Sequence, residues 1–241
     1  KHKFALTPSG HFLVERAREI LNMVEKTTLD IQEQEHNLAG SIAMGAGEYQ
    51  ATEVLAKLIG GFQKQYAAVS FELFTSSADL LQDKLDKGLL DVAILQAPVD
   101  TTNYDYLRLP IRETWCVLMR SDAPLASKNA ITASDLSGLP IILPARLQAR
   151  SEIFNWLSGD ITKMRFIGNS NLLANTAVFV EQCGYYGISV QMPLLDEKRF
   201  TYRPLTPALH SDILLVWRRD RQQSLALQKF LQFAKCFLSI E

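Results

Sequence analysis

Two clusters of small polar residues each stand between an apolar run that predicts a strand and a segment that predicts a helix. Thr75-Ser76-Ser77 is one cluster and Asn169-Ser170-Asn171 is the other. Hydroxyl and amide groups in this position commonly cap the helix that follows. In open α/β sheets, the carboxyl ends of the strands also face the ligand cleft. The two roles are compatible, so the clusters predict a binding site for a small polar ligand.

A third feature of this kind is the turn Gly45-Ala46-Gly47, which follows a predicted strand and precedes a predicted helix. Gln50 replaces the third glycine of a dinucleotide-binding fingerprint, so a dinucleotide site is not favoured. We expect the turn to present the backbone N–H groups of Glu48, Tyr49 and Gln50 at the start of the helix. A carboxylate or a phosphate binds readily to such a helix N-terminus.

Residues that could catalyse a reaction are not grouped in a recognisable pattern. Gly187-Ile188-Ser189-Val190-Gln191 resembles half of a nucleophile elbow but lacks the closing glycine. Cys116, Cys183 and Cys236 are widely spaced in apolar surroundings and are interpreted as buried thiols, and the four histidines are scattered. The sequence marks no paired carboxylates, activated nucleophile or metal-ligand spacing. It therefore favours binding over catalysis, with no metal and no cofactor.

The elements that would position these residues alternate between strand and helix. Strands are predicted at 41–45, 69–74, 91–95, 115–119, 140–143, 165–167, 188–190 and 212–217, and helices at 52–62, 80–85, 152–157, 172–182 and 224–238. Such alternation predicts βαβ units, parallel strands and an α/β fold. The last strand and helix have no place in the second series, so we expect the chain to cross back. Two α/β lobes joined by two crossings would form a cleft.

The first forty residues predict one long helix with a dimerisation seam. Thr7 is the expected N-cap, Pro8 the first helical residue and Gly40 the stop. Between them, apolar residues recur at alternating four- and three-residue steps, interrupted by Thr27 and Gln34. The seam residues are Leu13, Ala17, Ile20, Val24, Ile31 and Leu38. A helix of about 48 Å cannot bury this stripe against itself. A coiled-coil dimer is favoured, and a helix that packs on its own domain is the alternative.

Composition limits the classes of partner. The 25 Lys and Arg residues against 26 Asp and Glu residues give a net charge of −1, so no general attraction to nucleic acid is expected. The longest apolar runs, such as Ile213-Leu214-Leu215-Val216-Trp217, are far below the roughly 18 residues of a membrane-spanning helix. The first residues do not resemble a secretion signal. We therefore expect a cytoplasmic protein with no membrane partner.

Four ordered segments resemble signatures of the LysR-type transcriptional regulators, bacterial DNA-binding proteins with an effector-binding domain. Leu6-Thr7-Pro8-Ser9-Gly10 resembles the end of their wing and start of their linker helix, and Leu38-Ala39-Gly40 resembles the entry to their first effector-domain strand. Gly88-Leu89-Leu90-Asp91-Val92-Ala93-Ile94 is similar to their Gly-x-Leu-Asp-x-Ala-Ile segment. Pro124-Leu125-Ala126 is similar to their His-Pro-Leu-Ala loop, with Ala123 replacing the histidine. The winged helix-turn-helix that precedes the linker in the family is missing, so the chain is expected to be a fragment.

The resemblance implies two Rossmann-like subdomains in the type 2 periplasmic-binding-protein arrangement, with a small effector between them. The expected division is 1–39 for the end of the wing and the dimerising linker helix, 40–112 with 207–241 for subdomain I, and 113–206 for subdomain II. The implied effector-binding residues are Glu48, Tyr49, Gln50, Thr75, Ser76, Gln96, Asn169 and Ser170.

The expected effector carries a carboxylate that helix N-terminal amides hold, and Arg146 and Arg150 are positioned to assist. The family's Gly-x-Gly-Ile segment before a proline is replaced by Gly184-Tyr185-Tyr186-Gly187-Ile188, with a longer run to Pro193. This departure predicts that Tyr186 narrows the pocket.

These observations predict a ligand-responsive, dimeric or tetrameric transcription regulator that performs no catalysis. Its expected partners are a small-molecule effector, a second copy of itself, and DNA through the missing N-terminal domain alone. A solute-binding protein of the same two-lobe class is one alternative, which the dimerising helix disfavours. An enzyme on the same scaffold, such as a deaminase or a dehydratase, is the other. It would need a positioned acid-base group or a cofactor lysine, which the sequence does not mark.

Overall fold

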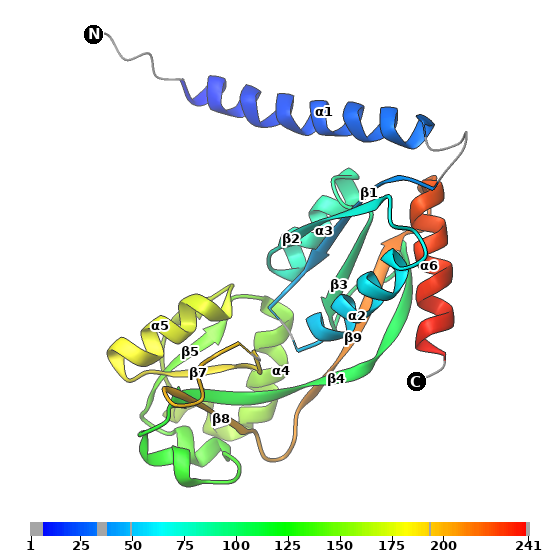
Figure 1. The fold of residues 1–241 in the computed structure, drawn as a ribbon. Helices are drawn as coiled ribbons and strands as arrows, with labels where there is room; N and C mark the ends of the chain where they lie inside the picture. Colours follow the sequence, from blue (N-terminus) through cyan, green and yellow to red (C-terminus); the bar gives the residue numbers. More distant parts are fainter. Residues whose placement is uncertain (1–6, 33–37, 49, 193, 240–241) are drawn as a thin grey trace.

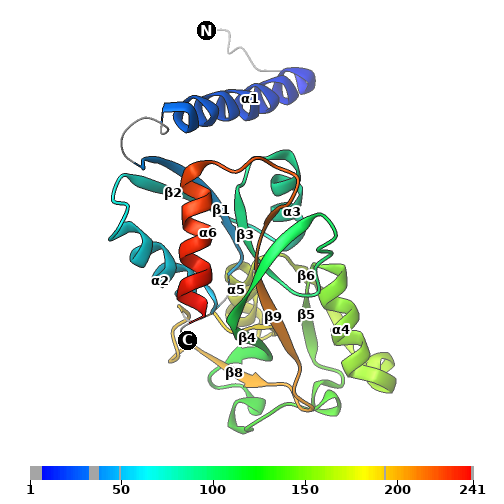
Figure 2. The same ribbon diagram turned by 90° about the vertical axis from the view of Figure 1, so that its right-hand side faces the viewer.

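The protein consists of two α/β lobes and one long helix that lies outside them (Figures 1 and 2). The computed structural model describes residues 7–32, 38–48, 50–192 and 194–239. The outer helix is α1 (Pro8–Gln32). Lobe I contains β1 (Gly40–Ala46), α2 (Thr52–Gln63), β2 (Val69–Thr75), α3 (Ala78–Lys87), β3 (Val92–Gln96) and α6 (Leu225–Leu238).

Lobe II is built from the middle of the chain, and two strands connect it to lobe I. Its strands and α-helices are β5 (Pro140–Pro144), α4 (Leu147–Leu157), β6 (Arg165–Ser170), α5 (Leu173–Cys183), β7 (Tyr186–Val190) and β8 (Phe200–Pro204). Its short 3-10 helices are η1 (Pro124–Ser127), η2 (Ala133–Leu136) and η3 (Ser158–Lys163). The connecting strands are β4 (Tyr104–Arg120) and β9 (His210–Arg218). The fold is therefore the expected α/β arrangement with two crossings.

The strands share one order, β2-β1-β3-β9-β4-β7-β5-β6, with β8 also paired to β4. β1 pairs in parallel with β2 and β3, and β5 pairs in parallel with β6 and β7. The pairs β3–β9, β4–β9, β4–β7 and β4–β8 are antiparallel. The prediction of parallel strands thus holds at the outer part of each lobe and is wrong for the connecting strands.

Strand β4 is much longer than the predicted strand at 115–119. Its first part, from Tyr104 to Thr114, pairs with β9, and its second part pairs with β7 and β8. Buried and exposed residues alternate irregularly in the first part, and the register shifts between Arg108 and Arg112. The sequence signal is weak there because an exposed, kinked strand does not need a regular apolar pattern.

Each lobe has its own hydrophobic core. In lobe I, Phe62 of α2 and Phe230 of α6 are fully buried, with ring centroids 5.4 Å apart and ring planes at 86°. The helix α3 covers the other face of this sheet with Leu81 and Leu85. In lobe II, α4 and α5 pack on opposite faces in the same way. These helices follow from the apolar spacing of the sequence. The residue boundaries proposed between the subdomains stay a prediction.

The start of α1 is as predicted and its end is not. Thr7 accepts a hydrogen bond from the Gly10 N–H (3.1 Å), which is N-cap geometry. Gly40 does not stop the helix but is the first residue of β1. Leu38 lies outside α1 and packs against the lobe I core, so its assignment to the seam is wrong. Gln34 lies outside the described residues.

The apolar face of α1 is largely exposed in one chain. Leu13, Ile20 and Val24 are 68%, 62% and 57% exposed, and Ala17 is half-buried. The side chain of Ile31 lies outside the described residues. An ion pair between Lys26 and Asp91 connects α1 to lobe I, and the other Asp91 oxygen accepts from the Ala43 N–H (2.8 Å). A polar contact therefore holds α1 near lobe I, while most of its apolar face is left for another surface.

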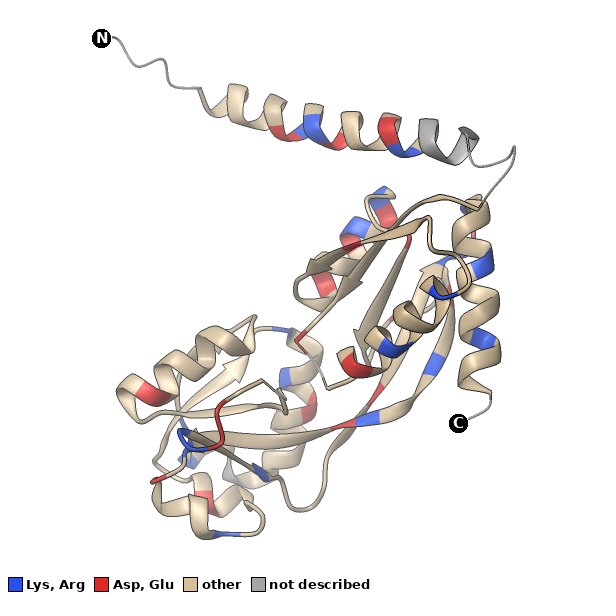
Figure 3. Cartoon of the chain, in the orientation of Figure 1, with Lys and Arg blue, Asp and Glu red and all other residues tan. Residues whose placement is uncertain are grey.

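Charges of both signs are spread over α1 and both lobes (Figure 3). This distribution agrees with the net charge of −1. None of the helices within the described ranges combines the length and the apolar character needed to cross a membrane.

Candidate functional site

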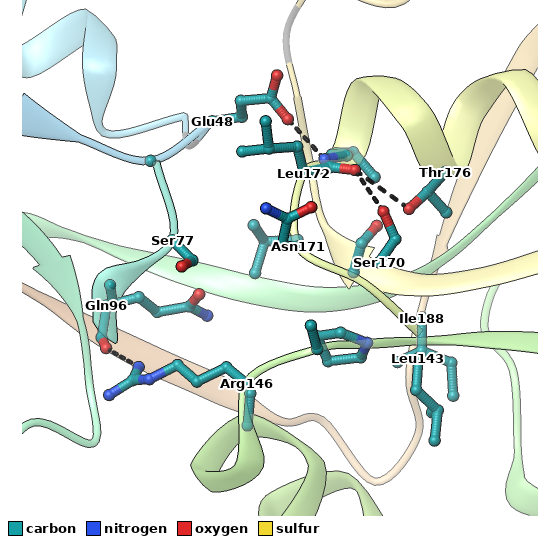
Figure 4. Close-up of a pocket in the computed structure, with 18 of the residues that line it drawn as sticks. Glu48, Ser77, Gln96, Leu143, Arg146, Ser170, Asn171, Leu172, Thr176 and Ile188 are labelled. Carbon is teal, nitrogen blue, oxygen red and sulfur yellow. Dashed lines mark hydrogen bonds between the residues drawn. The ribbon is translucent and has the colours of Figure 1, made fainter. Parts of the chain in front are cut away.

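The candidate site is a cleft between the lobes with an empty volume of about 710 Å³, its open mouth included. Lobe I contributes the turn after β1, the start of α3 and the end of β3. Lobe II contributes the starts of α4 and α5 and part of β7 (Figure 4). The apolar lining includes Trp115, Leu143, Leu172, Ile188 and Val190. The polar lining includes Glu48, Ser76, Ser77, Gln96, Arg146, Ser170, Asn171, Thr176 and Ser189.

Four of the predicted effector-binding residues line this cleft, namely Glu48, Ser76, Gln96 and Ser170. They lie at or just after the ends of three strands of lobe I and one strand of lobe II. Up to 122 positions of the sequence separate them, from residue 48 to residue 170. Strand ends meet at one edge of each sheet, so the prediction that polar groups converge there is sound for these four.

The other predicted positions do not line the cleft. Thr75 is exposed at the end of the edge strand β2, and Gln50, which is half-buried, is not among the residues that line the cleft. Asn169 lines an adjoining hollow beside Phe179 and Tyr185, which shares Ser170 and Asn171 with the cleft. Successive side chains of a strand point to opposite faces, so an error of one residue at a strand end moves the group to the wrong side. Tyr49 lies outside the described residues.

Two of the cleft residues that were not predicted are adjacent in the chain to predicted ones. Ser77 and Asn171 belong to the same polar clusters as Ser76 and Ser170, each one residue further along. Thr176 lies one turn into α5, and its hydroxyl donates to the Leu172 carbonyl (3.4 Å). In the sequence, a residue that faces the cleft one turn beyond a helix N-terminus has the same spacing from its neighbours as a residue buried in the core. No sequence signal distinguishes it.

At the start of α2, a carboxylate of the protein already accepts hydrogen bonds from two backbone N–H groups. The Ala51 N–H donates to Glu113 Oε1 (2.9 Å), and the Gln50 N–H also bonds to this carboxylate. Glu113 is fully buried, and its burial raises the pKa of the carboxyl group. The Gln50 N–H, which the sequence offered to an external anion, is therefore bonded to a carboxylate of the protein, while the Tyr49 N–H lies outside the described residues.

The N-terminus of α5 is held by a carboxylate from the opposite lobe. Glu48 Oε2 accepts from the Leu173 N–H (2.5 Å) and the Ala174 N–H (3.1 Å). Figure 4 shows the Glu48 side chain reaching over the cleft to the start of α5. Negative charge is stabilised there because the first N–H groups of a helix have no partner within the helix.

Arg146 makes a second contact between the lobes. Its guanidinium donates to the backbone carbonyls of Gln96 (2.5 Å) and Pro98, and it lies 3.3 Å from the Asp79 carboxylate. Its side chain is only 10% exposed. Among the described residues that line the cleft, Arg146 is the cation and Glu48 the carboxylate. Arg150, one helical turn along α4, has a buried Nε without a partner among the described groups.

Two polar groups of the cleft lack a partner among the described residues. Gln96 is 7% exposed, and its Nε2 makes no hydrogen bond. The Ser189 hydroxyl on β7 is also buried and makes no hydrogen bond to a described residue. A buried donor without a partner is unfavourable, and most such groups in native proteins are satisfied by water or a ligand. The cleft thus has unused donors that point to a ligand with acceptor oxygens.

Other candidate groups lie away from the cleft or in its walls. Cys116 is buried as predicted, and this burial raises the pKa of its thiol to about 12, which disfavours the reactive thiolate. Cys183 and Cys236 are exposed, so their interpretation as buried thiols is wrong. Tyr186 packs in the lobe II core and does not narrow the cleft. Within the described ranges, no His, Cys, Asp and Glu side chains gather in a group that could hold a metal ion.

Comparison with known proteins gives one consistent result. The family model for the LysR substrate binding domain matches residues 35–239. The uncharacterized HTH-type transcriptional regulator YvbU of Bacillus subtilis (strain 168) is 25% identical over 234 residues, which cover 95% of this chain and 78% of that protein.

Two solved structures have a similar fold. The effector binding domain of QuiR in complex with shikimate has a TM-score of 0.73 at 16% identity, covering 84% of this chain and 99% of that one. Full-length CbnR in complex with its target DNA has a TM-score of 0.74 at 12% identity, covering 98% of this chain and 83% of that one. At these identities the similarity establishes the fold.

Proposed function

Because this chain belongs to the LysR family of transcriptional regulators and contains the effector-binding domain, we propose that it senses a small carboxylate-bearing metabolite in the cleft between its lobes. The effector would favour one relative setting of the lobes. It can shift that equilibrium only by its differential affinity for the two settings. The shift would reposition DNA-binding domains that precede α1 in the full-length protein.

The observation that carries this proposal is the set of donors in the cleft. Arg146 supplies a cation, the Gln96 amide is buried without a partner, and Ser77 and Asn171 add neutral donors at the two edges. Trp115 and the aliphatic lining provide an apolar surface for a carbon skeleton. Several donors around an apolar floor suit an organic acid. The shikimate complex of QuiR, a protein of similar fold, is consistent with this class of effector.

The partners follow from the same assignment. We propose that α1 pairs with α1 of a second copy through its exposed apolar face, so that the regulator acts as a dimer or a higher oligomer. We propose the cytoplasm as its location, because a regulator must reach DNA. We also propose that it binds its effector without converting it, since the described residues of the cleft present donors and no nucleophile paired with a base.

A thermal-shift screen of organic acids, amino acids and sugars tests the proposal. An organic acid present at about 100 times its dissociation constant stabilises the protein by about 2.7 kcal/mol. For a chain of this size, 1 kcal/mol corresponds to about 2–4 °C, so the midpoint should rise by roughly 5–10 °C. Mass spectrometry of the recovered compound should show it unchanged. Conversion of the compound would favour an enzyme.

Paired variants locate the binding site. Ser77→Ala and Asn171→Ala remove donors from the cleft and should reduce the shift. Thr75→Ala and Asn169→Ala are matched controls, because they remove similar groups outside the cleft. All four residues are at least partly exposed, so the unliganded midpoints should change little. An effector whose shift depends on Asn169 and not on Asn171 would place the site elsewhere.

A further inference from the structure

Helix α5 has no N-terminal cap of its own. Its N-cap residue is Leu172, which has no side-chain oxygen, and its first turn has no acidic residue. The cap comes instead from Glu48, which is 125 residues earlier in the chain and in the other lobe. A helix N-terminus left without a cap is stabilised by any suitably placed anion. The first amides of α5 are therefore an anion site that an internal carboxylate fills.

The comparison with Glu113 shows that Glu48 is the exchangeable one of the two. Glu113, on the connecting strand β4, caps α2 of lobe I and is fully buried, so no solute can reach the contact. Glu48 is only partly buried, lines the cleft, and contacts a helix of the opposite lobe. Breaking the Glu48 contact requires no loss of core packing. It separates two surfaces that border an existing space.

Arg146 also contacts the opposite lobe, but it is a cation where Glu48 is an anion. It belongs to lobe II, and its guanidinium is occupied by two backbone carbonyls and the Asp79 carboxylate of lobe I. The amides of α5 and the Arg146 guanidinium are the groups of the cleft that bind anions most strongly. Both already have partners from the opposite lobe. The unpartnered Gln96 amide lies between the two contacts in Figure 4.

We propose that Glu48 is an internal ligand of the cleft, which joins the lobes in the effector-free protein by capping α5 and which an anionic effector displaces. Displacement exchanges a contact between the lobes for a contact with the effector, so binding alters how the lobes are held together. The competition with the effector rests on the proposed function. The capping of α5 by Glu48 does not, and it is measured without any ligand.

Amide hydrogen exchange by NMR on the effector-free chain tests the capping. Glu48→Gln replaces a charged acceptor with a neutral one of the same shape. It should speed exchange of the Leu173 and Ala174 amides about tenfold, the factor that corresponds to about 1.4 kcal/mol. The Val180 amide, inside α5, should not change. Glu53→Gln is the matched control, since it removes an exposed carboxylate of lobe I. Unchanged exchange at residues 173 and 174 would overturn the proposal.

Glu48→Asp separates reach from charge. The aspartate keeps the negative charge but is one methylene shorter, so it should lose the cap and show the same faster exchange. Wild-type exchange in this variant would show that a general negative potential protects the amides, and the proposal would be wrong.

Sulfate serves as the probe for displacement, with its binding followed from the chemical shifts of the Leu173 and Ala174 amides. Removal of the internal competitor should make Glu48→Gln bind sulfate about tenfold more tightly than wild type. The same affinity in both proteins would overturn the displacement and leave a purely structural cap.

Discussion

The sharpest prediction concerns the exposed apolar face of α1. The double substitution Leu13→Asp with Ile20→Asp places two charges on this face. Leu13 and Ile20 are the seam residues directly before and directly after Ala17. Leu13 and Ile20 are 68% and 62% exposed within one chain. If α1 pairs with a second copy, both side chains become buried, and the aspartates then oppose pairing.

The size of the effect follows from the exposed fractions. Full burial of a Leu or Ile side chain contributes about 1.5–3 kcal/mol, so burial of the exposed two-thirds contributes roughly 1–2 kcal/mol. Each protomer supplies both residues, so about 4 kcal/mol or more is lost from the helix pair. Since 1.4 kcal/mol is a factor of ten, association through α1 should weaken by about a thousandfold or more.

Sedimentation equilibrium over a range of concentrations measures this change. The matched control is His11→Asp with Asn22→Asp, which adds two aspartates to exposed positions of α1 off the seam. Only a weak effect on association is expected from this control. Association that persists weakly through the lobes is compatible with the argument, whereas an unchanged dissociation constant is not.

Unfolding in urea, measured on the dilute protomer, separates the two interpretations of α1. Because Leu13 and Ile20 are exposed in the protomer, its free energy of unfolding should change by about 0.5 kcal/mol or less. Ile20 also borders a hollow with Leu89 of lobe I. If the apolar face packs on lobe I, the double substitution would destabilise the protomer and leave association intact. That result would refute the dimer argument.

Three further predictions concern lobe I and the connecting strand β4. Burial raises the pKa of Glu113, so the carboxyl group binds its proton more tightly in the folded state than in the unfolded state. The free energy of unfolding of wild type, compared with that of Glu113→Gln, should therefore fall as the pH rises from the ordinary carboxyl pKa through the raised pKa. Urea titrations at several pH values measure this difference, and parallel curves for the two proteins would contradict the prediction. Ser224→Ala removes the N-cap bond to the Leu227 N–H (3.1 Å) and should lower the free energy of unfolding by about 1 kcal/mol in urea, with Gln223→Ala as control. Phe230→Ala removes a fully buried ring that packs against Phe62 and Phe71. It should lower the free energy of unfolding by about 3–5 kcal/mol, seen as a lower urea midpoint, and a loss below 1 kcal/mol would mean that the core collapses around the gap.

The sequence by itself determined the fold class and most of the elements. Helices such as α2 and α6 follow from apolar residues at three- and four-residue spacing, and strands such as β1 and β3 follow from short apolar runs between turns. Thr7 as an N-cap is a local signal of the same kind, and the structure confirms it. These features are predictable because they depend on residues that are close in the chain.

Structural features that depend on a partner distant in the chain were predicted poorly. The first half of β4 carries charged residues and no regular pattern, and its pairing with β9 stabilises it as a strand. Leu38 fits the heptad spacing but packs on the lobe I core, because the chain enters β1 two residues later. Spacing shows that a residue can join a seam, and the tertiary structure decides which apolar surface it meets.

The same division is clearest for the polar groups at the strand ends and for the two glutamates that cap helices. The sequence predicted polar groups at the strand ends, and Ser76, Gln96 and Ser170 line the cleft as expected. It could not predict that Glu113 fills the N-terminus of α2 or that Glu48 caps α5, because these carboxylates are 62 and 125 residues from the amides that they bind. Local sequence fixes where a helix begins. Only the packing of the lobes decides which charge is brought to its N-terminus, since electrostatic contacts depend on distance in space and not on distance along the chain.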